Sequence, residues 1–314
     1  MRNQEETNYE VIIVGAGPSG LAAALTLLEE GISDVIVIER FEFPRYKCCA
    51  GYITEKTKAV YETFGLNIEE AHYSLIRDFN IFYRLKKRQT ILNKFLYTNR
   101  TIDRVELDNT FAELAKSKGI QIKENTTISE HDADKKELKL SNGEILTYEK
   151  LIFADGTSGF GSRLQAVHKK NIAMQLVFPN SAAEEIQIHF GITKRGYGWV
   201  SSYGGFTNVG LTDVFDKSVN YHEVFAGFLK KLGLQADMSA LRGAFTPMEV
   251  GEGKACEDIY FVGDAVGACD PMTLSGLRYG LDSGKLCAEA IAKKDDRLYF
   301  ACIRKMKKKF ALMR

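Results

Sequence analysis

Residues 10–20 read EVIIVGAGPSG, and this stretch decides the fold of the chain. Its first half is apolar after Glu10 and rich in β-branched residues, which is typical of a buried parallel strand. A glycine-rich turn follows, and residues 21–30 predict a helix. Residues 34–38 predict a second strand with Glu39 at its end. This order of strand, glycine turn, helix, strand and acid predicts a dinucleotide-binding βαβ unit.

Each part of this unit has a physical task. Gly15 allows the tight turn, Gly17 lets the backbone approach a pyrophosphate, and Gly20 lets the helix pack on the strand. The helix N-terminus offers unpaired N–H groups and the positive end of its dipole to phosphate. Glu39 can accept hydrogen bonds from ribose hydroxyls. The unit alone does not distinguish FAD from NAD. The alternative is a glycine-rich turn with a structural role only.

Two later segments bear on that choice. Residues 151–156 read LIFADG, a strand ending in Asp-Gly, and residues 259–265 read IYFVGDA, a strand ending in Gly-Asp. A helix is expected from about residue 276 to 293, and its small side chains allow a close approach to a cofactor or sheet. Each segment alone is also compatible with an ordinary turn at the end of a strand.

Taken with residues 39–51 (ERFEFPRYKCCAG), 103–104 (DR) and 263–276 (GDAVGACDPMTLSG), these segments resemble the geranylgeranyl reductase family. That family belongs to the FAD enzymes with the p-hydroxybenzoate hydroxylase fold. The resemblance covers nearly the whole chain in the right order. It implies Asp264 beside the ribityl–pyrophosphate region of FAD and Arg104 near the cofactor. The cofactor-binding residues expected in all are Gly15, Gly17, Pro18, Ser19, Gly20, Glu39, Arg40, Cys49, Ala50, Arg104, Asp155, Gly156, Gly263, Asp264, Pro271, Gly276 and Leu277.

The resemblance also implies the fold. We expect the α/β class: a Rossmann-like FAD-binding domain of the glutathione reductase/p-hydroxybenzoate hydroxylase type, with an inserted α+β substrate domain that contains an antiparallel sheet. The expected FAD-binding domain is discontinuous and comprises residues 1–71, 101–168 and 246–314. The expected substrate domain comprises residues 72–100 and 169–245. Within the expected FAD-binding domain, Asn142-Gly143 predicts a hairpin turn.

Residues 47–51 (KCCAG) carry the candidate catalytic group. Cys49 matches the family's cysteine, which sits over the flavin next to the substrate, where a thiol can donate a proton or shape the pocket. Ala50 stands where the family often has glycine, so the backbone is less free. The alternatives are a buried structural cysteine, or a surface pair Cys48-Cys49 that oxidises.

Residues 195–210 are rich in aromatic residues and glycines. They resemble the family's Tyr-x-Trp-x-Phe-Pro stretch that lines a lipid cavity, which implies Tyr197 and Trp199 as substrate residues. Ser201-Ser202 replaces Phe-Pro, which puts the shape of the substrate in doubt. The alternative without a substrate role is a β-hairpin whose aromatic residues pack in the core.

Composition sets the remaining limits. The net charge of +1 gives no global field that favours nucleic acid. The polar start and the lack of an apolar run of ~20 residues predict a cytoplasmic protein with six reduced cysteines. The five histidines (72, 131, 168, 189, 222) show no metal spacing, so no metal is expected. Residues 304–314 are basic with interleaved apolar residues, which fits a solvated helix or, alternatively, peripheral membrane contact. Family members usually continue beyond this point, so an end at Arg314 predicts a more open cavity.

We therefore expect an FAD-dependent oxidoreductase of lipid metabolism. It would reduce carbon–carbon double bonds of a geranylgeranyl-type isoprenoid by hydride transfer from reduced flavin. The electrons would come from transiently bound NAD(P)H or another reduced carrier, since one glycine-rich βαβ unit is visible. The alternatives are a flavin monooxygenase acting on a small ring and a non-catalytic redox sensor or electron carrier. The KCCAG segment argues against the hydroxylase, and a halogenase is less expected because its Trp-x-Trp-x-Ile-Pro signature is absent.

Overall fold

The computed structural model describes residues 7–92, 99–165, 169–179 and 185–312. Its contacts divide the chain into two compact units. Unit 1 comprises Met1–Arg45, Asp108–His168 and Pro247–Arg314, and unit 2 comprises Tyr46–Leu107 and Lys169–Thr246. The expected discontinuous nucleotide-binding fold with an insertion is confirmed.

The division differs from the expected boundaries at residue 246, which lies in unit 2, and in two longer stretches. Residues 46–71 and 101–107 were expected with the FAD-binding domain but pack in unit 2. The physical reason is strand pairing, since β3 (Tyr52–Ile53) pairs antiparallel with β7 (Arg100–Ile102), which in turn pairs with β4 (Tyr73–Leu75).

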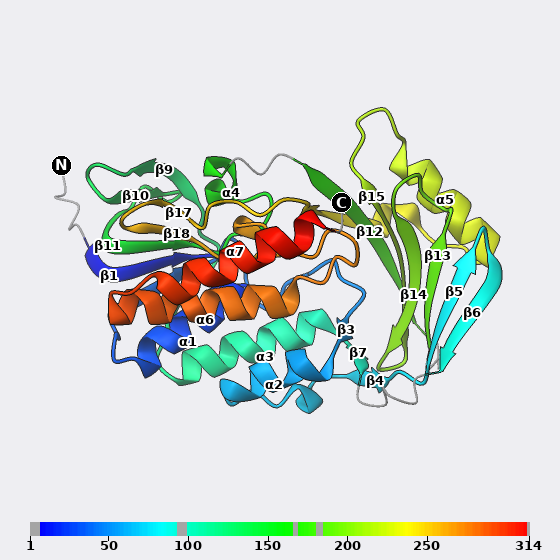
Figure 1. The fold of residues 1–314 in the computed structure, drawn as a ribbon, viewed down its shortest axis with the longest axis horizontal. Coiled ribbons are helices and arrows are strands. Elements are labelled where there is room, and N and C mark those ends of the chain that lie inside the picture. The colour runs from blue at the N-terminus through cyan, green and yellow to red at the C-terminus, as the bar shows by residue number, and fades with distance from the viewer. Residues whose placement is uncertain (1–6, 93–98, 166–168, 180–184, 313–314) are drawn as a thin grey trace. The chain divides into compact units, whose positions relative to one another are not determined.

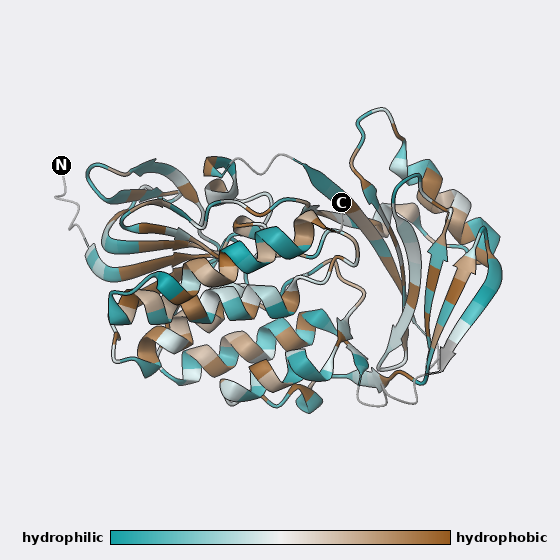
Figure 2. Ribbon diagram, viewed as in Figure 1, coloured by the Kyte–Doolittle hydropathy of each residue, from teal (hydrophilic) through white to brown (hydrophobic). Residues whose placement is uncertain are grey.

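Unit 1 is built on an eight-stranded mixed sheet with the order β17-β18-β11-β1-β2-β8, to which β10 and β9 are added through β11. The neighbours of β1 and β2 are all parallel, and the β9–β10–β11 excursion is antiparallel around the Asn142-Gly143 turn. Figure 2 shows that hydrophobic residues run along these strands. The strands are β1 (Thr7–Val14), β2 (Val35–Ile38), β8 (Gln121–Lys123), β9 (Ile128–Asp132), β10 (Glu137–Leu140), β11 (Ile145–Phe153), β17 (Lys254–Cys256) and β18 (Ile259–Phe261).

The helices α1, α6 and α7 of unit 1 lie side by side along this sheet (Figure 1). α1 is buried along almost its whole length, because Ala and Leu dominate it. Four residues of α7 (Tyr299, Ile303, Met306 and Phe310) are buried, and its basic residues lie on the outer face with the exposed Leu298. The helices are α1 (Pro18–Glu29), α4 (Phe160–Leu164), the 3₁₀ turn η3 (Gly263–Ala265), α6 (Leu277–Lys293) and α7 (Arg297–Ala311), while α3 (Arg104–Ser117) begins in unit 2 and ends in unit 1.

Unit 2 contains a seven-stranded sheet with the order β16-β12-β15-β14-β13-β5-β6 and the small antiparallel sheet β3-β7-β4. The larger sheet is mostly antiparallel, with one parallel pair between β5 and β13. Helix α5 covers one face of it (Figure 1), where Phe225, Phe228 and Leu229 pack on the strands. The further elements are α2 (Glu55–Thr63), η1 (Ile68–Glu70), β5 (Asp78–Tyr83), β6 (Lys86–Leu92), β12 (Lys170–Pro179), β13 (Glu185–Phe190), β14 (Tyr197–Tyr203), β15 (Phe206–Val214), α5 (Tyr221–Leu232), η2 (Met238–Ala240) and β16 (Arg242–Pro247).

Candidate functional site

The glycine turn between β1 and α1 is closed by direct backbone packing. The N–H of Gly15 donates to the carbonyl of Ile38 over 2.7 Å, with Gly15 at φ +105°. A Cβ on Gly20 would lie 1.9 Å from the carbonyl oxygen of Gly15. Both positions therefore require glycine, as the sequence predicted. Gly15 has a positive φ and a Cβ there would meet the carbonyl oxygen of Ala154 at 2.5 Å, whereas a side chain on Gly20 would push α1 away from the turn.

The N-terminus of α1 faces the turn with its backbone donors free of a side-chain cap. Gly17 is the N-cap residue and forms no side-chain capping bond, and Pro18 begins the helix. Backbone N–H groups of a first helical turn need a partner, and an anion is a suitable one. The turn is thus prepared for a phosphate group.

Glu39 lies at the end of β2 and is 4% exposed. Its two oxygens accept from the N–H groups of Ala16 (2.9 Å) and Phe41 (3.1 Å). A carboxylate has about four acceptor positions, so Glu39 retains capacity for a ribose hydroxyl. Its hydrogen bond to Ala16 also ties the acid directly to the phosphate-binding turn.

Arg45 is a site residue that the sequence reasoning missed. Its Nε lies 3.6 Å from Glu39, its Nη1 lies 3.7 Å from Asp108, and its Nη2 donates to the carbonyl of Ala16 over 3.4 Å. Nη2 is also 3.7 Å from the place that a Cβ on Gly17 would take. The guanidinium therefore stands beside the phosphate-binding turn, where its charge complements a pyrophosphate. The signal was present in the FPR triplet of residues 43–45, which was used only as a family marker.

The later glycine segments join the same site within unit 1. A Cβ on Gly263 would lie 2.4 Å from Oγ of Ser19, and one on Gly284 would lie 2.1 Å from the carbonyl oxygen of Ser19. A Cβ on Gly276 would lie 3.2 Å from Oδ1 of Asp264. Segments that are distant in the sequence thus pack closely, with Gly263 and Gly284 against the first turn of α1 and Gly276 against Asp264. Pro271 and Leu277 belong to the loop and first helical turn around Gly276.

Asp155, with Gly156 after it, follows β11. Burial raises the pKa of this carboxyl to about 6, although the N–H of Gly161 donates to Oδ2 over 2.7 Å. Oδ1 is buried and has no hydrogen-bond partner among the described residues, and the same holds for Nε of Arg45. Buried polar atoms normally have partners, so these two atoms fit a site that accepts a polar ligand. Arg40, by contrast, is exposed, with its guanidinium 4.7 Å from the ring centre of Phe41.

The residues of unit 1 thus fit a dinucleotide such as FAD. Gly15, Gly17 and the first turn of α1 would hold the pyrophosphate with Arg45, and Glu39 would hold the ribose. The particular contacts of each residue with the cofactor stay a prediction.

In unit 2, the Cys48–Gly51 segment lies on the face of the large sheet opposite α5. Met174, Val209 and Leu211 pack with α5, so the alternating Gln175 and Asn208 point to the other face. Gln175 accepts from the N–H of Cys49 (2.9 Å), and Asn208 donates to its carbonyl (3.0 Å).

Cys49 and Cys48 are free thiols with different surroundings. The N–H of Gly51 lies 3.4 Å from Sγ of Cys49. Burial raises the pKa of Cys48 to about 12, so its thiol stays protonated at neutral pH. Both side chains are half-buried, and neither forms a disulfide.

Aromatic and aliphatic side chains extend from Cys49 along the same face. Tyr197, Trp199 and Ser201 alternate with residues that face α5, and Ile188 and Ile186 lie opposite Trp199 and Ser201 on β13. The rings of Tyr197 and Phe190 are 6.1 Å apart, and those of Tyr197 and Trp199 are 6.5 Å apart. Phe190 is 42% exposed and Trp199 only 4%, so this apolar face is open toward Phe190 and closed at Trp199. Tyr197 and Trp199 as substrate residues stay a prediction.

Arg104 begins α3 directly after β7 and is buried. The N–H of Ile102 donates to the carbonyl of Gly51 over 3.0 Å, which brings the start of α3 next to the cysteine segment within unit 2. Asp103 caps the helix by accepting from Val105. The Glu106 carboxylate accepts from the N–H of His72.

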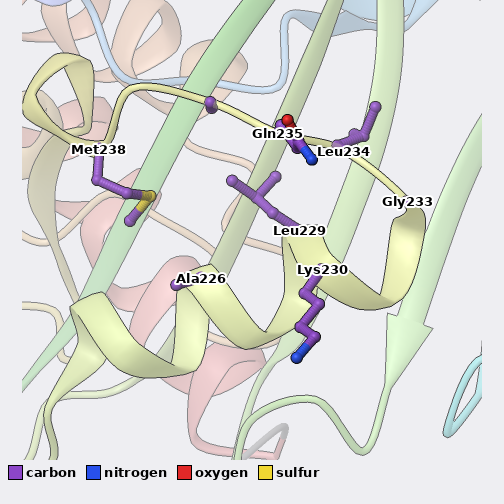
Figure 3. Close-up of a pocket in the computed structure, with 8 residues that line it drawn as sticks. Ala226, Leu229, Lys230, Gly233, Leu234, Gln235 and Met238 are labelled. Atoms are coloured by element: carbon purple, nitrogen blue, oxygen red, sulfur yellow. The ribbon is translucent and has the colours of Figure 1, made fainter.

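A hollow of about 450 Å³ lies at the C-terminal end of α5 and the loop after it (Figure 3). Leu229, Leu234 and Met238 line it, and Lys230 is its one charged residue among those that line it. It opens on the α5 side of the sheet and contains none of the residues predicted for the site. Among the residues described here, no group of three or more His, Cys, Asp or Glu side chains forms a metal site; His168 lies outside the described residues.

Comparison with known proteins agrees with this geometry. Residues 8–159 match the FAD binding domain family. Within these residues the chain thus has an FAD binding domain, and its fold is p-hydroxybenzoate hydroxylase-like. It is similar to a geranylgeranyl bacteriochlorophyll reductase-like protein from Thermoplasma acidophilum, with a TM-score of 0.78 and 19% identity over 96% of this chain and 83% of that one. The resemblance drawn from the sequence is confirmed.

Relatives by sequence include two named reductases. A menaquinone reductase from Mycolicibacterium smegmatis is 26% identical over 90% of this chain and 76% of its own length. A digeranylgeranylglycerophospholipid reductase from Methanocaldococcus jannaschii is 24% identical over 91% of this chain and 77% of its own. The fold is also shared with a probable FAD-dependent monooxygenase from Pseudomonas aeruginosa (TM-score 0.71, 14% identity, 96% and 92% covered). The fold alone therefore does not decide the substrate.

Proposed function

We propose that this chain reduces a carbon–carbon double bond in a prenyl chain. The observation that carries the proposal is the apolar face of unit 2, which runs from the Cys49 segment past Trp199 and Tyr197 to the exposed Phe190. Such a surface suits a flexible hydrocarbon that buries its area against aromatic rings. The named relatives include reductases whose substrates carry prenyl chains, which supports the same class.

The chain's own residues would bind, orient and protonate. FAD, when bound and reduced, would supply the hydride chemistry. The second carbon of the double bond must receive a proton, and Cys49 carries an S–H group at the closed end of the apolar face. Burial raises the pKa of the nearby Tyr203 to about 12, so its hydroxyl also stays protonated at neutral pH. The apolar side chains would exclude water from the double bond.

The test is single-turnover reduction. The FAD-loaded chain is reduced anaerobically and mixed with a menaquinol, whose already reduced ring cannot reoxidise the flavin, with a digeranylgeranyl lipid, and with a saturated-chain analogue of each as a control. We expect flavin reoxidation and a product heavier by two hydrogens with an unsaturated chain only. If the flavin stays reduced with every prenyl compound, the proposal is wrong.

Repeating the experiment with and without oxygen separates the rival activities. Reoxidation that requires oxygen and yields a hydroxylated ring would favour a monooxygenase, whose fold this chain shares. A flavin that cycles reversibly while Cys48 and Cys49 oxidise would favour a redox sensor. Replacing the chemical reductant with NADPH or NADH in a steady-state assay tests the proposed transient donor.

A further inference from the structure

Two unusual residues of the chain contact each other. Ala50 stands where the resembling family often has glycine, and Ser201 begins the pair that replaces Phe-Pro. The hydroxyl of Ser201, which is fully buried, donates to the carbonyl of Ala50 over 2.9 Å. Ser201 on the sheet therefore provides a hydrogen-bond donor for the segment that contains Ala50.

The backbone on both sides of Cys49 is held by buried amides. Gln175 on β12 is 3% exposed and accepts from the N–H of Cys49, while Asn208 on β15 is fully buried and donates to the carbonyl of Cys49. With Ser201 these side chains bind three of the four polar backbone groups of Cys49 and Ala50. Buried hydrogen bonds of this kind restrict the position of a segment because an unpaired group there would be costly.

Trp199 determines which way the amide of Asn208 points. Its indole N–H donates to Oδ1 of Asn208 over 2.9 Å, so Nδ2 of the amide is directed to the carbonyl of Cys49. The indole can lie across the sheet because residue 210 is glycine, where a Cβ would be 2.0 Å from Cζ2 of Trp199. Trp199 is thus linked to Cys49 through the side chain of Asn208.

We propose that Trp199, Asn208, Gln175 and Ser201 form a polar cradle that positions the thiol of Cys49. In this cradle Trp199 and Asn208 are positioning residues, and the indole acts through the amide. The proposal rests on Cys49 belonging to the site of the proposed function. The two proposals can be tested separately. The cradle concerns the geometry and reactivity of the Cys49 thiol, whereas the proposed function concerns the identity of the substrate.

The test measures the reactivity of Cys49 in the FAD-loaded full chain. The rate of iodoacetamide alkylation is followed from pH 6 to 10 by mass spectrometry, with fragmentation of the peptide that follows Lys47 to distinguish Cys48 from Cys49. In Asn208→Leu and in Asn208→Asp, which keeps the acceptor for Trp199 but loses the donor to Cys49, we expect the rate at Cys49 to change about fivefold, the equivalent of one hydrogen bond. Emission of Trp199, the single tryptophan of the chain, should shift in Asn208→Leu.

The matched control is Thr212→Val, four residues along β15. Thr212 is buried, and its hydroxyl donates to the carbonyl of Ile172 over 2.9 Å and not to the backbone of Cys49 or Ala50. A purely structural role of Asn208 predicts equal Cys49 rates in Asn208→Leu and Thr212→Val, and that result would overturn the proposal.

A second variant tests the relay. Trp199→Phe should change the Cys49 rate in the same direction as Asn208→Leu, and the double variant should match Asn208→Leu alone, because both substitutions break one path. Additive effects would contradict the relay. Each of these results is independent of whether any prenyl compound is turned over, so failure of the proposed function and failure of the cradle are distinguishable.

Discussion

Single residues in unit 1 show how charge is arranged around the phosphate-binding turn. Glu39 and Arg45 both contact Ala16, one through its N–H and the other through its carbonyl. The acid can bind ribose and the base can bind pyrophosphate, although the two lie 3.6 Å apart. Their mutual attraction keeps each in place before a ligand arrives.

Replacing Arg45 should therefore weaken FAD retention. We expect Arg45→Ala to raise the dissociation constant for FAD about tenfold, as for loss of one charge-assisted hydrogen bond, and Arg45→Lys to raise it less. Titration of the stripped protein with FAD, followed by flavin fluorescence, measures it. Lys135→Ala, on the exposed turn between β9 and β10, is the control. Equal affinities in Arg45→Ala and the control would remove Arg45 from the site.

His189 in unit 2 gives a pH-dependent stability. It is 1% exposed, its ring stacks on Phe82, and burial lowers its pKa to about 4 from 6.5. The unfolded chain binds this proton below about 6.5 and the folded chain does not, so the free energy of unfolding should fall as pH drops from 6.5 toward 4. The loss is at most about 3 kcal/mol.

Urea unfolding at several pH values tests this prediction. His189→Leu should flatten the dependence between pH 6.5 and 4, whereas His222→Gln, at an exposed position on α5, should leave it unchanged. A dependence of equal steepness in His189→Leu and the parent chain would show that other groups cause it.

At the scale of elements, small residues determine how closely α6 approaches α1. Gly280, Ser283 and Gly284 are buried on α6, and Ser283 donates to the carbonyl of Gly280 while accepting from the N–H of Gly263. This face allows α6, η3 and the first turn of α1 to meet within unit 1. Larger side chains would separate them.

Gly284→Ala should consequently destabilise unit 1. Its Cβ would meet the carbonyl of Ser19 at 2.1 Å, and such overpacking costs about 1–3 kcal/mol. Gly227→Ala on α5 is the matched control: it meets no atom within 4 Å, and alanine favours a helix by up to about 1 kcal/mol. Chemical unfolding of both variants should show opposite signs. A neutral Gly284→Ala would mean that α6 can move away without cost.

At the scale of the whole molecule, the chain forms two units from five segments of sequence. No helix among residues 7–92, 99–165, 169–179 and 185–312 is long and apolar enough to cross a bilayer. Ile303, Met306 and Phe310 are buried, so any contact of α7 with a membrane would use its basic outer face together with Leu298, which is 64% exposed.

FAD should stabilise unit 1 more than unit 2. At about 100 times its dissociation constant a ligand adds about 2.7 kcal/mol to the folded state that binds it. Hydrogen exchange with and without FAD should show added protection in residues 10–20, in β2 and in α6, and little in β5, β6 and β13. Protection confined to unit 2 would contradict the assignment of the cofactor to unit 1.

Local patterns in the sequence were sufficient for much of this fold. Residues 10–39 predicted β1, α1, β2 and the position of Glu39, because glycine spacing and a run of β-branched residues act over a few residues. The Asn142-Gly143 hairpin was predicted for the same reason, because a hairpin turn is also local.

Only the tertiary structure decided the surroundings of the predicted dinucleotide turn and of Cys49. Arg45 became a site residue because its side chain reaches Ala16 and Asp108, and no local pattern encodes that reach. Gln175 and Asn208 are ordinary strand residues until the register of β12 and β15 places both beside Cys49. The glycine turn was therefore determined by the sequence itself, since backbone sterics are local. The cradle of Cys49 was decided by strand pairing, since it joins residues more than a hundred positions apart.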